Sequence, residues 1–120
     1  MKLFRSPILA IVLLSLIFLG FGTYRLTESP ATWDDEGMIG QLSINLATHG
    51  IMGIQEAPGV FQSGAFMSVG FPYLFPLALS FKIFGVGILQ ARAVSIAFGV
   101  LFILLMYAYI KREFGARWRY

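Results

Sequence analysis

Residues 7–24 read PILAIVLLSLIFLGFGTY and contain no charged side chain. A helix that crosses a bilayer needs about 20 predominantly apolar residues, with a lower limit near 17, so this stretch is long enough to span. Lys2 and Arg5 precede it, and Arg25 follows it. A basic start before an apolar core also fits a cleavable signal peptide, but residues 20–25 (GFGTYR) lack a small-x-small cleavage pattern. We therefore predict an uncleaved membrane anchor.

The composition of the whole chain is that of a membrane protein or of a piece of one. Of the 120 residues, 58% are hydrophobic and 12% are charged, whereas soluble domains average about 45–50% apolar and about 25% charged residues. The absence of cysteine excludes a disulfide framework and a thiolate metal site. The net charge of +3 comes from basic residues that flank apolar stretches, so we expect no nucleic-acid partner.

A second uncharged apolar stretch covers residues 93–110, directly after Arg92. The basic residues that follow it are Lys111, Arg112, Arg117 and Arg119. Two spans place both chain ends on the same side of the membrane, and the positive-inside rule puts their basic residues in the cytoplasm. We therefore predict an integral membrane protein with both termini cytoplasmic and the lipid bilayer as its first partner.

Residues 71–84 are apolar but shorter, and they contain Pro72, Pro76 and Lys82. A third span here would move the C-terminal basic residues to the outer face, so we predict a helix that lies at the outer interface or is partly buried in protein. The predicted fold is all-α membrane: two transmembrane helices joined by an outer loop with two interfacial helices. Its parts are a span at 7–24, an outer loop at 25–90 with helices at about 35–48 and 71–84, a span at 92–111 and a cytoplasmic tail at 112–120.

Residues 32–37 read TWDDEG and hold three of the six acidic residues of the chain. The spacing of Thr32 and Asp35 is that of a capping box, and carboxylates in a first turn favour the positive end of the helix dipole. A helix from about Asp35 to Thr48 would end near Gly50, which can adopt the left-handed conformation. Its apolar stripe would consist of Met38, Ile39, Leu42 and Leu46. Two interpretations of the acids remain open: a plain helix start, or an active-site base or metal ligand at the outer membrane face.

Residues 52–70 are rich in Gly and Ser, contain Pro58 and show no clear hydrophobic period, so we predict a loop. Loops longer than about 12–15 residues are often functional or disordered. Phe61 and Phe66 make this segment too apolar for a free linker. We expect it to pack over another part of the protein.

Five short motifs follow one another along the chain: WDDEG (33–37), ATHG (47–50), FKIFG (81–85), QARAVS (90–95) and YIKREFG (109–115). In order and spacing the chain resembles the N-terminal part of membrane glycosyltransferases of the C-type fold. Within them it is most similar to the protein-mannosyltransferase and lipid A aminoarabinose transferase superfamily. The resemblance covers the chain from about residue 30 to residue 115.

The resemblance implies transfer of a sugar from a polyprenyl-phosphate carrier to an acceptor at the outer face of a bacterial or archaeal plasma membrane. It assigns the catalytic acid to Asp35, followed by Glu36, with Asp34 as the neighbouring alternative. A carboxylate there would take the acceptor's proton or bind a divalent metal ion, for which Asp35 is the candidate ligand. Arg92 and Lys82 are candidates for binding the carrier's phosphate, although each also fits a snorkelling side chain that anchors a helix.

Two departures from the family pattern matter. Residues 68–72 (SVGFP) lack the acid and the lysine that precede two prolines in the aminoarabinose transferases, which argues against that sugar. The family's enzymes run to several hundred residues, so we expect this chain to be an N-terminal fragment that is inactive alone and needs missing C-terminal spans or another membrane subunit.

The alternative is a small two-span membrane protein with a structural or partner-binding role. A transporter fragment is a weaker option, because the spans lack intramembrane ionisable residues.

Overall fold

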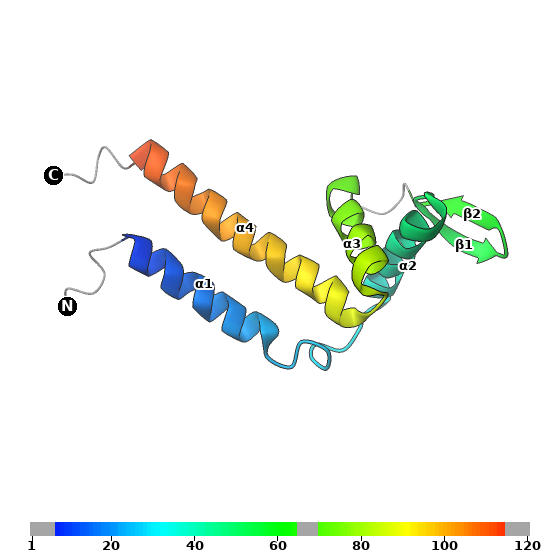
Figure 1. The fold of residues 1–120 in the computed structure, drawn as a ribbon, viewed down its shortest axis with the longest axis horizontal. Coiled ribbons are helices and arrows are strands. Elements are labelled where there is room, and N and C mark those ends of the chain that lie inside the picture. Colours follow the sequence, from blue (N-terminus) through cyan, green and yellow to red (C-terminus); the bar gives the residue numbers. More distant parts are fainter. Residues whose placement is uncertain (1–6, 65–69, 115–120) are drawn as a thin grey trace. The chain divides into compact units, whose positions relative to one another are not determined.

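The computed structural model describes residues 7–64 and 70–114 of the chain and is mostly helical (Figure 1). The elements in chain order are α1 (Pro7–Thr23), α2 (Asp34–His49), β1 (Gly53–Ala57), β2 (Val60–Ser63), α3 (Phe71–Phe84) and α4 (Ile88–Phe114). They form two compact units. We call residues 25–94 the middle unit, and residues 7–24 with 95–114 the helix pair. Helix α4 contributes its first residues to the middle unit and the remainder to the helix pair.

Within the described residues, one helix is long and apolar enough to cross a membrane. It covers Ile88–Glu113, 26 residues of α4, and its apolar window is not buried inside the protein. Helix α1 has 17 residues and counts among the shorter apolar helices. The span predicted at 92–111 thus lies in a helix of sufficient length, whereas the span predicted at 7–24 stays a prediction from the sequence.

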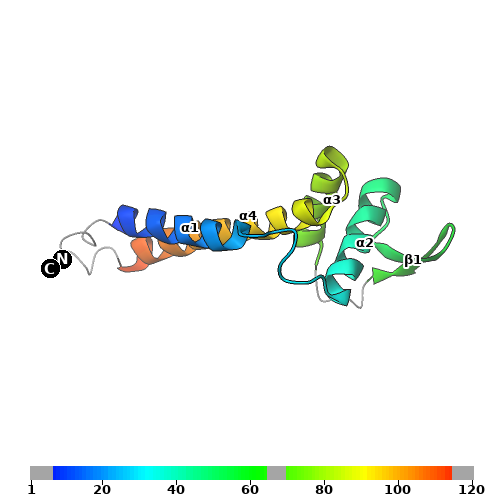
Figure 2. The same ribbon diagram turned by 90° about the horizontal axis from the view of Figure 1, so that it is seen from below.

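In the helix pair, α1 and the later part of α4 lie side by side (Figures 1 and 2). The ring of Phe18 occupies the space that a side chain at Gly99 would fill, and a side chain at Gly22 would begin 3.5 Å from Ile96. The two helices therefore contact at these small residues, where Phe18 and Ile96 reach the other helix. Most of the large apolar side chains on both helices remain exposed.

The core of the middle unit lies between α2 and α3, which run next to each other (Figure 1). Helix α3 buries one face, made of Leu74, Leu77, Ala78 and Phe81. These positions follow the i, i+3, i+4, i+7 spacing of an amphipathic helix. Helix α3 has the bounds predicted from the sequence, and its burial confirms the expectation that it is partly covered by protein. Leu42 of α2 is fully buried in the same core.

Helix α2 begins one residue earlier than predicted and without the expected side-chain cap. Its N-cap is Trp33, and no side chain caps the helix start, so the capping box between Thr32 and Asp35 does not form. The last turn agrees with the prediction, because Gly50 has a φ of 68° and its N–H donates to the carbonyl of Leu46. This is the left-handed termination that favours glycine.

The buried face of α2 also differs from the predicted stripe. The buried residues are Leu42, Ser43 and Asn45, and Met38 is 41% exposed. The reason is that α2 has two neighbours, because α3 and strand β1 both pack against it. A helix covered from two sides buries positions that a single apolar stripe does not indicate.

The prediction of a loop at 52–70 is wrong for the first half of this segment, which forms an antiparallel hairpin. The strands pair Gly53 with Ser63 and Gln55 with Phe61, with an irregularity before the turn. Gly59 in the turn has a φ of 78°, which suits glycine. Phe61 contacts the ring of His49 with centroids 5.2 Å apart, so the expectation that this segment packs over another part of the protein is confirmed. Phe66 lies outside the described residues.

Candidate functional site

The three predicted acids occupy the first turn of α2, and the structure divides them. Asp34 and Asp35 are exposed, whereas Glu36 is half-buried. Within residues 7–64 and 70–114, neither aspartate carboxylate has a hydrogen-bond or ion-pair partner. All three carboxylates gain from the positive end of the helix dipole, and Glu36 has in addition a specific partner.

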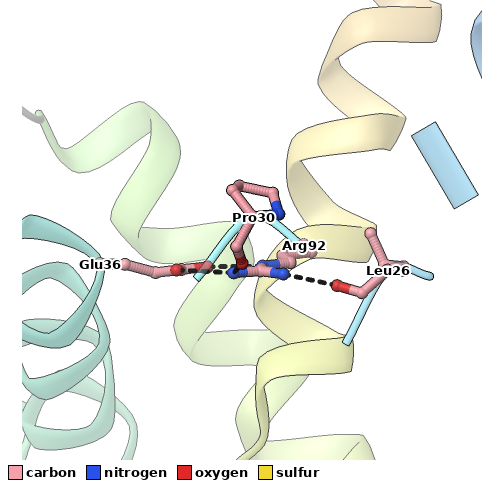
Figure 3. A network of polar contacts seen from close by, with 4 residues as sticks. All are labelled: Leu26, Pro30, Glu36 and Arg92. Atoms are coloured by element: carbon pink, nitrogen blue, oxygen red, sulfur yellow. Dashed lines mark hydrogen bonds and ion pairs between the residues drawn. The ribbon is translucent and has the colours of Figure 1, made fainter. Parts of the chain in front are cut away.

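Arg92, on the first turns of α4, binds Glu36 in a two-pronged ion pair (Figure 3). Nε of Arg92 lies 2.8 Å from Oε1 of Glu36, and Nη2 lies 3.0 Å from Oε2. The same guanidinium donates to the carbonyl of Leu26 from Nη1 at 2.7 Å and to that of Pro30 from Nη2 at 2.8 Å. All four residues belong to the middle unit. The network ties the segment before α2, the first turn of α2 and the start of α4 to one side chain.

The ion pair keeps Glu36 ionised. The hydrogen bonds from Arg92 lower the pKa of Glu36 below its ordinary value, partial burial opposes that shift, and the positive charge of Arg92 adds to it. A guanidinium has five N–H donors in a planar fork that matches a carboxylate. Since Arg92 makes four hydrogen bonds to protein acceptors, it has little capacity left for the phosphate contact expected from the sequence.

An open groove of about 760 Å³ lies beside the acids. It is lined by the start of α2, by Phe81 near the end of α3, and by the turn that leads into α4. Its polar and charged lining residues are Thr32, Asp34, Glu36 and Gln41, and its largest apolar ones are Trp33, Met38, Ile44, Phe81 and Ile88. The groove therefore combines two carboxylates, an amide and apolar surface, with no basic side chain in its lining.

The predicted site residues do not all reach this groove. Asp34 and Glu36 line it, whereas Asp35, Lys82 and Arg92 do not. Lys82 is exposed in the last turn of α3, where the helix dipole favours a cation. The structure thus brings Asp34 and Glu36 together in one groove and pairs Glu36 with Arg92, whereas Asp35 and Lys82 take no part in either.

The described residues hold no cluster of three metal-ligating side chains. Within residues 7–64 and 70–114, no three His, Cys, Asp or Glu side chains are placed to hold an ion together. Asp35 has no such neighbours, and the ring of His49 lies against Phe61. Binding of a divalent ion by Asp35 stays a prediction from the sequence, and we derive no step through a metal.

The Glu36–Arg92 pair was not predicted from the sequence. There, Glu36 is a candidate catalytic acid, and Arg92 is a candidate phosphate ligand or a snorkelling helix anchor. The two residues are 56 positions apart, and local patterns do not report such a contact. One signal was present: an arginine directly before an apolar helix needs an acceptor when it is buried, because an unpaired buried charge is strongly unfavourable.

No protein-family model, curated protein or solved structure matches this chain.

Proposed function

We propose that this chain is part of a membrane glycosyltransferase that moves a sugar from a polyprenyl-phosphate carrier to an acceptor at the outer membrane face. The observation that carries the proposal is the groove beside α2, where the unpaired carboxylate of Asp34 lies next to apolar surface. A site for a lipid-linked sugar needs both kinds of surface, polar groups for the sugar and apolar groups for the lipid. The resemblance of residues 33–37 to the family's catalytic motif supports the same location.

The proposed membrane setting has both α1 and α4 as transmembrane helices. At 1.5 Å per residue, the 17 residues of α1 extend about 25 Å. The hydrocarbon core is about 30 Å thick, and about 17 residues is the lower limit for a helix that spans it. The exposed apolar side chains of both helices would then contact lipid. The middle unit would lie at the outer face and both termini in the cytoplasm, as the distribution of basic residues predicts.

In the proposed reaction the acceptor's hydroxyl oxygen attacks the anomeric carbon of the carrier-linked sugar. A bond forms between that oxygen and the anomeric carbon, the bond to the carrier's phosphate oxygen breaks, and the phosphate leaves with the electron pair. A carboxylate takes the acceptor's proton. We assign this role first to Asp34, because it lines the groove and has no partner among the described residues, and keep Asp35 as the residue that matches the family motif. Lys82 remains a candidate for the phosphate.

The test uses cells of the natural host, in which any partner that the chain needs is present, and compares their membranes with membranes from host cells that lack the chain. Transfer of radiolabelled sugar is measured from a panel of polyprenyl-phosphate sugars to endogenous acceptors. We expect transfer that depends on the chain and that falls about 100-fold or more in Asp34→Asn, as is usual for loss of a general base. Asp35→Asn tests the motif residue, and Glu28→Gln, in an exposed ion pair outside the groove, is the matched control.

A second candidate function is a structural or partner-binding role in the membrane. The observation in its favour is the extent of exposed apolar side chain on α1 and α4, which suits contacts with other membrane helices as well as with lipid. Equal sugar transfer with and without the chain would refute the enzyme and support this alternative. Wild-type transfer in both aspartate variants would refute the catalytic assignment alone.

A further inference from the structure

Arg92 is the most buried charged side chain at the acidic helix start. Its side chain is 10% exposed, and that of Glu36 is 31% exposed. A second ion pair of the middle unit, between Arg25 and Glu28, has side chains that are 59% and 60% exposed. Exposed pairs contribute little to structure, because solvent screens them and their side chains lose entropy when they pair. A shielded guanidinium with four protein acceptors is a fixed part of the fold.

The hydrogen-bond acceptors of Arg92 come from two neighbouring parts of the chain. Leu26 and Pro30 lie in the segment that leads into α2, and Glu36 lies in its first turn (Figure 3). The segment between α1 and α2 has no helix or strand of its own. The hydrogen bonds to its carbonyls therefore fix the direction from which the chain enters α2. That direction sets where Thr32, Trp33 and Asp34, the first residues of the groove, are held.

The same network determines the charge of the groove. Two carboxylates line it, and Arg92 is bound to Glu36 from outside the lining. We infer that Arg92 is a positioning residue: it withdraws Glu36 from chemistry at the groove and leaves Asp34 as the groove's one unpaired carboxylate among the described residues. This assignment does not rest on the proposed sugar transfer, because it concerns the state of carboxylates in the protein without substrate.

The experiment measures the reactivity of each carboxylate in the purified full chain, reconstituted in nanodiscs. A water-soluble carbodiimide with glycinamide as the nucleophile converts accessible carboxyl groups to amides, and peptide mass spectrometry gives the rate at each residue. Glu56, exposed on the hairpin, is the internal reference. In the wild-type chain we expect Asp34 to react at a rate comparable to Glu56 and Glu36 to react several-fold more slowly.

Two variants separate the role of Arg92 from a general effect on folding. Arg92→Gln should raise the rate at Glu36 several-fold and move the pH profile of its labelling upward, because the hydrogen bonds that lower its pKa are lost. Arg92→Lys keeps a charge without the forked donors, so it should restore part of the protection. Arg25→Gln is the matched control: it should raise labelling of Glu28, its partner, and leave Glu36 unchanged.

Three results would overturn the inference. The first is a wild-type rate at Glu36 equal to that at Asp34, which would mean that Arg92 does not protect it. The second is protection of Asp34 equal to that of Glu36, which would mean that Asp34 is also paired. The third is an unchanged rate and pH profile of Glu36 in Arg92→Gln. The first two comparisons use the wild-type chain alone, so they decide the matter even where Arg92→Gln does not fold.

Discussion

The side-chain amide of Asn45, buried on α2, donates a 2.7 Å hydrogen bond to the backbone carbonyl of Gly53 at the start of β1. Gly53 is buried as well. This bond connects the middle of α2 to the first residue of the hairpin, and it joins elements whose contact the sequence does not indicate. Farther along the strand, Gln41 makes a longer and exposed contact of 3.5 Å to the carbonyl of Gln55.

Replacing Asn45 with Ala should therefore detach the hairpin from α2. The substitution leaves the buried carbonyl of Gly53 without its donor, at a cost of about 1–3 kcal/mol. We expect faster amide hydrogen exchange throughout residues 53–63, measured by mass spectrometry. Gln41→Ala is the control, with an expected effect within about 0.5 kcal/mol because its bond is long and exposed. Equal exchange in both variants would show that Asn45 does not hold the hairpin.

Replacing Gly99 with Leu should disturb the helix pair. A side chain at Gly99 would overlap the ring of Phe18, and overpacking of this kind costs about 1–3 kcal/mol. Gly20→Leu is the matched control, because nothing lies within 4 Å of a side chain added there. Thermal unfolding in detergent should show a lower midpoint for Gly99→Leu than for Gly20→Leu.

The double variant Phe18→Ala with Gly99→Leu tests whether the two residues meet. Removal of the ring makes room for the leucine, so the double variant should be more stable than the sum of the single effects predicts. Neighbouring residues show such coupling, whereas distant ones are additive. Additive effects of the two substitutions would argue against the contact between Phe18 and Gly99.

The ion pair between Glu36 and Arg92 should make the middle unit sensitive to acid. The pKa of Glu36 is lower in the folded protein than the ordinary value of a glutamate side chain. A lowered folded pKa means that the stabilisation is complete above the unfolded pKa and is lost as the pH falls through the folded one. We expect amide exchange of residues 26–36, corrected for the intrinsic pH dependence, to rise as the pH falls below about 4.3.

The control for this pH effect is Glu36→Gln, which has no carboxyl to titrate at that position. Its corrected exchange at residues 26–36 should be faster than wild type at neutral pH, and the two should converge in acid. The difference between the two chains isolates Glu36 from the other acids, which titrate in both. Parallel curves across the acid range would show that the ion pair does not stabilise this segment.

The sequence predicted the helices well because their signals are local. The apolar stretch at 71–84 predicted α3, which begins at Phe71 and ends at Phe84. The left-handed end of α2 followed from Gly50 alone. Each of these signals is contained in one helix and its caps, so no knowledge of the tertiary contacts was needed.

The hairpin and the roles of the acids could not be predicted in this way. The strands have five and four residues, too few for a clear alternation, and the hairpin is held by Asn45, a residue whose partner no pattern identifies. Adjacent residues on a helix point about 100° apart, so Asp34 and Asp35 cannot both face one groove equally. Which of them faces it depends on the direction of the chain before α2, and that direction is set by Arg92, a residue far away in the sequence.

The proposed topology predicts a specific labelling pattern, which the absence of cysteine makes simple to test. Single cysteines are placed at Lys2, Gln62 and Glu113, and intact cells are treated with a membrane-impermeant maleimide. If α1 and α4 both span, the cysteine at Gln62 reacts from outside, and those at Lys2 and Glu113 react only after permeabilisation. If α4 alone spans, the cysteines at Lys2 and Gln62 react on the same side. Labelling of Glu113 from outside, with Gln62 protected, would invert the orientation and contradict the positive-inside argument.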